Sequence, residues 1–139
     1  MDTPIDPLDM ARQVLQNQPF SCFLGAELTR FDTIAELQLP LKPEFLQQNG
    51  FAHGGVISYL ADNALTFAGG LALGPNVLTS EYKIHYLKPA QGEMLIARAE
   101  VEHAGRSQSV CRCEIFARKD DDEVLCALAI GTIVAFRKS

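Results

Sequence analysis

The sequence predicts an α+β fold in which one antiparallel sheet of five to six strands wraps around one long central helix. The first observation is a helical apolar run in the middle of the chain, over about residues 54–70. The second is a set of strand-like segments whose connections are too short for the crossovers that parallel strands need. Since an antiparallel sheet must bury one face, the central helix is expected to cover it.

Composition supports one compact domain over residues 1–139. Hydrophobic residues make up 47% of the chain and charged residues only 21%, which is enough apolar material for a core. The net charge of −5 and the absence of a basic cluster argue against nucleic-acid or membrane-surface partners. The acidic N-terminus does not resemble a signal peptide, and no apolar run of bilayer length is free of Gly or charge, so we expect a cytoplasmic protein.

The first elements are predicted as a short helix and two strands. An amphipathic helix is expected over residues 7–18, with Pro7 near its start and Pro19 just beyond its end. Its apolar residues recur at helical spacing: Leu8, Ala11, Val14 and Leu15. Strands are predicted over 22–32 and 33–41, and residues 40–52 are predicted as a loop with about one helical turn.

The central helix carries one apolar stripe. Its members are Ile57, Leu60, Ala61, Ala64, Leu65 and Ala68. Half of these side chains are alanines, which is typical of a helix that packs closely on a sheet. Gly69 and Gly70 are predicted to end it.

Four strands are predicted after the helix, over residues 77–87, 92–104, 107–119 and 123–138. Their short connections predict a four-stranded meander, with a turn at Asp120, Asp121 and Asp122. The last strand is apolar at nearly every position, so its outer face is expected to meet another subunit.

The four cysteines are expected to be reduced. Cys22, Cys111, Cys113 and Cys126 could form two disulfides by number alone. Cys111 and Cys113, however, lie two apart in a strand-like stretch, which places them on one face without the tight turn of a zinc knuckle. We therefore expect free thiols and no metal site.

The segment FAHGGVISYLADNALTFAGG, residues 51–70, contains the strongest functional signal. His53 and two glycines open the helix, although Gly54 and Gly55 form a weak helix start. Asp62 lies in the middle, where Asp is a poor helix former. Because these residues are unfavourable for helix stability, their spacing indicates a functional site.

This pattern resembles the hotdog-fold acyl-CoA thioesterases of the PaaI type, in the 4-hydroxybenzoyl-CoA thioesterase-like superfamily. That family opens its central helix with His-Gly-Gly, places an acidic residue nine positions after the His, and ends a later strand with an aromatic, a basic residue and Pro. His53, Asp62 and the segment Tyr86-Leu87-Lys88-Pro89 match these positions. The resemblance implies hydrolysis of acyl-CoA thioesters without a cofactor beyond the CoA of the substrate, a functional homodimer and often a homotetramer.

Thioester hydrolysis explains these residue types. The N–H groups at a helix N-terminus stabilise the oxygen of a carbonyl under attack, and Gly54 and Gly55 let a substrate approach them closely. The Gly55 N–H is the predicted donor. Asp62 is expected either to attack the carbonyl carbon or to deprotonate a water molecule.

Helix geometry predicts that the site is shared. At ~1.5 Å per residue, Asp62 lies roughly 13 Å along the helix from His53, which is too far for both to reach one carbonyl group. If both act, they come from different chains, and a dimer has two sites.

Supporting roles are assigned to other residues. Relatives commonly carry Asn six positions before the His, where this chain has Gln47, so either Gln47 or Asn49 is expected to orient the thioester or water. Thr79 or Ser80 is expected to hydrogen-bond Asp62 or the attacking water, with Thr79 at the family's hydroxyl position. Lys88 and Arg106 are candidates for the CoA phosphates. The acyl group is expected near Phe51, Tyr59 and Leu60.

Two alternative functions stay open at this point. A hydratase or dehydratase of the same fold would act on the α and β carbons of an acyl thioester. A non-catalytic module would bind acyl thioesters without turnover.

Overall fold

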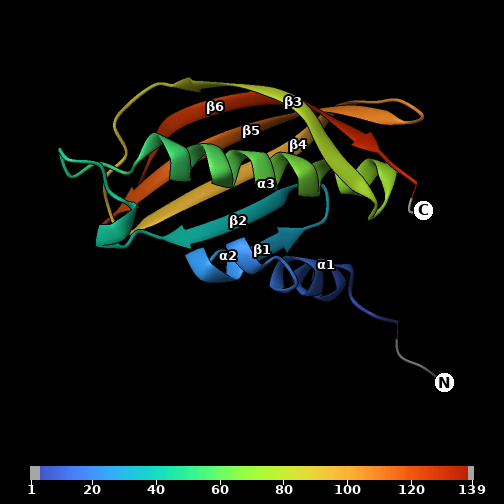
Figure 1. Ribbon diagram of the computed structural model, residues 1–139, viewed down its shortest axis with the longest axis horizontal. Helices are drawn as coiled ribbons and strands as arrows, with labels where there is room; N and C mark the ends of the chain where they lie inside the picture. Colours follow the sequence, from blue (N-terminus) through green and yellow to red (C-terminus); the bar gives the residue numbers. More distant parts are fainter. Residues whose placement is uncertain (1–3, 138–139) are drawn as a thin grey trace.

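The computed structural model describes residues 4–137 and contains one six-stranded antiparallel sheet that curves around a central helix, as predicted (Figure 1). The helices are α1 (Pro7–Gln16), α2 (Pro19–Leu24) and α3 (Gly54–Leu73), with a single 3₁₀ turn, η1 (Pro43–Phe45). The strands are β1 (Glu27–Phe31), β2 (Ala35–Pro40), β3 (Val77–Tyr86), β4 (Met94–Ala104), β5 (Gln108–Lys119) and β6 (Asp122–Ala135).

The strand order β1-β2-β4-β5-β6-β3 corrects one expectation. Strands β4, β5 and β6 form a meander, but β3 pairs with β6 instead of β4. The seven residues after β3 cross the end of the sheet to begin β4 on the far side of β5. An extended chain of that length spans about 23 Å, which is enough to pass over two strands spaced about 4.8 Å apart.

The predicted strand over 22–32 is also wrong in its first half. Residues Pro19–Leu24 form α2, because Pro19 is favourable in a first helical turn and Gly25 ends the helix with a left-handed φ of 88°.

The predicted loop at 40–52 is confirmed, with η1 as its one turn. The triple-Asp turn is confirmed as well, since Asp120 and Asp121 have φ of 51° and 75°, as the tight β5–β6 hairpin requires.

Helix α3 runs one turn further than predicted. Gly69 and Gly70 lie inside it, and Gly74, with φ of 92°, follows its end. All six residues of the predicted stripe are buried, and Leu60, Ala61, Ala64, Leu65 and Ala68 are fully inaccessible. By length and composition α3 could cross a membrane, but it is the core helix that packs against the sheet.

Gly69 lies where α3 closely approaches the sheet. A Cβ atom at this position would lie within 2.5 Å of Ile133 Cβ on β6. The glycine is therefore required by close packing of backbone against a neighbouring side chain, and it does not terminate the helix.

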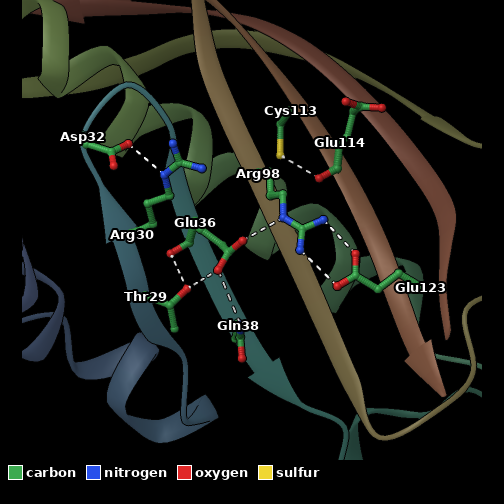
Figure 2. A network of polar contacts seen from close by, with 9 residues as sticks. All are labelled: Thr29, Arg30, Asp32, Glu36, Gln38, Arg98, Cys113, Glu114 and Glu123. Atoms are coloured by element: carbon green, nitrogen blue, oxygen red, sulfur yellow. Dashed lines mark hydrogen bonds and ion pairs between the residues drawn. The ribbon is translucent and has the colours of Figure 1, made fainter. Parts of the chain in front are cut away.

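The outer face of the sheet carries an ion-pair network centred on Arg98 (Figure 2). Arg98 Nε donates to Glu36 Oε2 at 2.7 Å, and its two terminal nitrogens donate to Glu123 at 2.8 and 3.0 Å. The guanidinium also lies 5.0 Å from the centre of the Phe116 ring. Burial tends to raise the pKa of Glu36, but bonds from Thr29 and Arg98 outweigh it and hold that pKa below its usual value. The Arg98 bonds lower the pKa of Glu123.

Replacing Gly69 by Ala should destabilise the protein by about 1–3 kcal/mol, because the added methyl group overpacks the contact with Ile133. Urea unfolding measures this change. The matched control is Gly70→Ala, whose Cβ would meet nothing closer than Val77 Cγ2 at 4.0 Å. That variant should be slightly more stable than the wild type, since Ala is the better helix former. Equal effects of the two variants would contradict the assigned contact.

Replacing Arg98 by Met should lower stability by about 1 kcal/mol at pH 7 and by less at pH 3. Carboxylates whose pKa is lowered by folding stabilise the protein above their unfolded pKa, and this contribution disappears as the pH falls through the folded value. Urea unfolding at both pH values measures the difference. A loss that is the same at pH 3 would show that the contact with Phe116, and not the ion pairs, is responsible.

Candidate active site

The start of α3 is held by a short, pinned loop. Gly50, with φ of 84°, allows the turn in which its N–H donates to Gln47 O. Ala52 N donates to Ala90 O, and His53 N donates to Phe45 O, both at 2.8 Å. These bonds hold the chain on both sides of Phe51. His53 follows in an extended conformation and is the N-cap residue of α3.

His53 caps α3. Its Nδ1 accepts a hydrogen bond from the Gly55 N–H at 2.8 Å, and its side chain is exposed. The predicted donor for a substrate carbonyl thus already has an acceptor, which an entering oxygen would have to replace. Gly54 faces the end of β3: Tyr86 donates through its hydroxyl to Gly54 O at 3.0 Å. Tyr86 is 55% exposed and lines the cavity at this helix start.

A cavity of about 360 Å³ lies at the start of α3. It brings together four predicted site residues, Gln47, Phe51, Gly54 and Lys88. Asn49 is exposed and does not line it; its N–H donates to the Gln47 side chain. Of the two candidate amides, Gln47 is therefore the one beside the helix start.

Asp62 lies in a second cavity, also of about 360 Å³, on the opposite side of α3 from the sheet core. Thr79 on β3 donates through its hydroxyl to Asp62 Oδ1 at 2.7 Å, which is the bond expected for Thr79. Thr66 lies 2.7 Å from the Thr79 hydroxyl and donates to the Asp62 carbonyl oxygen at 2.8 Å. Ser80 is exposed at a register shift between β3 and β6 and makes no such contact.

A polar cluster that the sequence did not reveal borders Asp62. Tyr59 donates to Ser21 Oγ at 2.6 Å, Ser21 donates to Gln18 Oε1 at 2.6 Å, and Asn63 Nδ2 reaches Gln18 Oε1 at 3.1 Å. Burial raises the pKa of Tyr59, so the phenol stays a neutral donor. The cluster ties α2 to α3. No local sequence signal indicated it, because its members come from separate segments and α2 was not predicted as a helix.

The two cavities are separate within one chain. None of the described residues lines both cavities. Phe51 and Tyr59, both expected beside the acyl group, fall in different cavities, and Leu60 is fully buried in the core. Since α3 is continuous between them, Asp62 remains roughly 13 Å along the axis from His53.

Arg106 lies away from the helix start in the same chain. It belongs to the β4–β5 hairpin, whose Ser107 O accepts a hydrogen bond from Ala135 N. Ala135 in turn pairs with Val77, just after the end of α3 (Figure 1). Within one chain, Lys88 therefore lies near the start of α3, and Arg106 lies toward its other end.

Three of the four cysteines are buried, and Cys22 is exposed. All four cysteines are free, as expected. Burial raises the pKa values of the Cys111, Cys113 and Cys126 thiols, which keeps them neutral. No cluster of three or more His, Cys, Asp or Glu in this part of the chain could hold a metal ion.

Comparisons with known proteins agree on the family. Residues 49–124 match the family model of the Thioesterase superfamily. A thioesterase family protein from Silicibacter pomeroyi superposes with a TM-score of 0.85 at 34% identity, covering 90% of this chain and 94% of that one. A thioesterase from Haemophilus influenzae gives 0.81 at 26% identity, covering 96% and 92%. A 1,4-dihydroxy-2-naphthoyl-CoA hydrolase from Listeria monocytogenes is 29% identical over 75% of this chain and 84% of its own length.

The matched segment contains the His-Gly-Gly helix start, Asp62 and Thr79. Together with the sheet wrapped around α3, this shows that the chain is a thioester hydrolase with the hotdog fold and belongs to the Thioesterase superfamily.

Proposed function

We propose that this protein is an acyl-CoA thioesterase whose active sites are each formed by two subunits of a homodimer. The observation that carries the proposal is the separation of the helix-start cavity from the Asp62 cavity along one continuous helix. One subunit supplies the Gly55 N–H, and the other supplies Asp62 and Thr79. The CoA hydrolase among the relatives supports a CoA thioester as substrate.

In this mechanism the thioester carbonyl oxygen takes the place of His53 Nδ1 as acceptor of the Gly55 N–H. The N-terminal end of the α3 dipole then stabilises the negative charge that develops on that oxygen. Gln47, on the wall of the helix-start cavity, orients the thioester or water through its side-chain amide, and Phe51 lines the same cavity beside the thioester. Lys88 provides a local cation for the CoA phosphates, which an acidic protein otherwise lacks.

Asp62 performs the attack or directs it. The Thr79 hydroxyl donates to Oδ1, which leaves Oδ2 as the oxygen proposed to react. As a base it takes a proton from water; the water oxygen bonds to the carbonyl carbon, the C–S bond breaks, and the CoA thiolate leaves and is protonated. As a nucleophile Asp62 itself displaces CoA, and water then cleaves the mixed anhydride. Transfer of oxygen-18 from water into the carboxylate in a single turnover would identify the second route.

Replacing Asp62 by Asn should lower kcat by about 10²–10⁴-fold, because the amide can neither accept a proton nor attack. Thiol release from a panel of short, medium, long and aromatic acyl-CoAs measures this loss, with a control without substrate for the four native cysteines. Hydration of an enoyl-CoA without thiol release would indicate a hydratase instead. Tight binding without turnover, unchanged in the variant, would indicate a binding module.

Mixed dimers test the shared site. Gly55→Pro removes the N–H, and Pro is tolerated in a first helical turn; Gly55→Ala keeps the N–H and disturbs the His53 ring in a similar way. Both Gly55→Pro and Asp62→Asn should be inactive alone. Random reassembly of the two should restore about a quarter of wild-type activity, since half the dimers would each contain one intact site. No recovery from verified mixed dimers would refute a shared site.

Replacing Thr79 by Val should lower kcat by about 10- to 100-fold, the loss expected for a hydrogen bond to a charged group. Thr79→Ser retains the hydroxyl and is the matched control. Steady-state kinetics of both variants, together with their thermal unfolding, separate this effect from a loss of stability. Wild-type kcat in Thr79→Val would show that the bond does not orient Asp62.

A further inference from the structure

A third cavity, of about 310 Å³, lies between α1, the C-terminal half of α3 and the start of β3. Its lining is apolar except at one end, where Gln18 and Thr66 contribute the polar side chains. Met10 and Val14 of α1 form part of its wall and are 54% and 46% exposed, so this wall reaches the surface.

The cavity adjoins the Asp62 cavity. Gln18 and Thr66 line both spaces. Thr66 also bonds to the Asp62 carbonyl oxygen and contacts the Thr79 hydroxyl, so the polar end of the apolar space is the end nearest the predicted reacting group. Gln18 is held in place by Ser21 and Asn63.

Gly70 faces this cavity, and packing does not require a glycine there. A Cβ atom at Gly70 would meet nothing closer than Val77 Cγ2 at 4.0 Å, whereas the neighbouring Gly69 would overlap Ile133. The φ of Gly70 is in the ordinary range for a helix. Glycine in the middle of a helix is less stable than alanine, so its effect here is to leave the cavity open.

We propose that this cavity holds the apolar acyl group of the substrate, and that Gly70 and α1 set the length of acyl group the enzyme accepts. An engineered cavity of about 150 Å³ binds benzene, so a space of about 310 Å³ suits an acyl group of roughly eight to twelve carbons. None of the side chains from residues 4–137 that line it is charged, which disfavours dicarboxylic acyl groups. The inference rests on the proposed thioesterase function and adds its substrate class.

The test compares Gly70→Leu, which fills the cavity, with Ala72→Leu, which adds the same side chain at an exposed position of the same helix. The kcat/KM is measured for acyl-CoAs from two to sixteen carbons. The wild type should be most active near eight to twelve carbons. In Gly70→Leu, kcat/KM for decanoyl-CoA should fall at least about tenfold and that for butyryl-CoA should change less than about twofold. Ala72→Leu should match the wild type.

Binding of free decanoic acid, followed by calorimetry, separates the two proposals. If no acyl-CoA is hydrolysed, the thioesterase proposal fails, but decanoate binding that is lost in Gly70→Leu and kept in Ala72→Leu still supports the cavity. The cavity proposal is overturned if decanoate does not bind the wild type, or if a folded Gly70→Leu protein keeps the wild-type chain-length profile. Thermal unfolding of each variant verifies folding.

Discussion

The close packing of α3 on the concave face of the sheet is the constraint on which the rest of the structure depends. Alanines at positions 61, 64 and 68 and the glycine at 69 allow the helix to approach the strands closely, and Gly69 comes into direct contact with Ile133. Burial of this face against the sheet sets the rotation of α3 about its own axis. Everything that the other side of the helix presents follows from that fixed rotation.

The rotation explains how a polar site can occupy a helix that is otherwise core. One face is buried and carries no polar side chain, while the opposite face presents Tyr59, Asp62, Asn63 and Thr66 away from the apolar core of the sheet. The edge strand β3 then supplies Thr79 to Asp62, and α2 supplies Ser21 and Gln18 to Tyr59 and Asn63. In the described part of the chain, every buried side-chain N or O atom has a hydrogen-bond partner. The polar face of α3 is therefore accommodated without the energetic cost of unpaired buried polar groups.

The ion pairs and the proposed site lie in different parts of the structure. The strongest ion pairs, around Arg98, lie on the outer sheet face and stabilise the fold at a distance from both cavities. At the helix start, the site proposed above has backbone N–H groups and one cation among its lining residues, Lys88. A helix N-terminus can stabilise developing negative charge without a buried formal charge, whose desolvation would be costly.

The sequence by itself determined the features that depend on local patterns. The apolar stripe of α3, the loop at 40–52, the hairpin at Asp120 and Asp121, and the pairing of Thr79 with Asp62 were all predictable, because helical periodicity, turn residues and motif spacing act over short distances or match a known family. Only the tertiary structure decided that β3 pairs with β6, that α2 is a helix, and that Gly69 and Gly70 lie within α3. Strand partners and close approaches join residues far apart in the chain, where local propensity has little influence. For the same reason the polar cluster around Ser21 and the cavity beneath α1, built from separate elements, could not be read from any one segment.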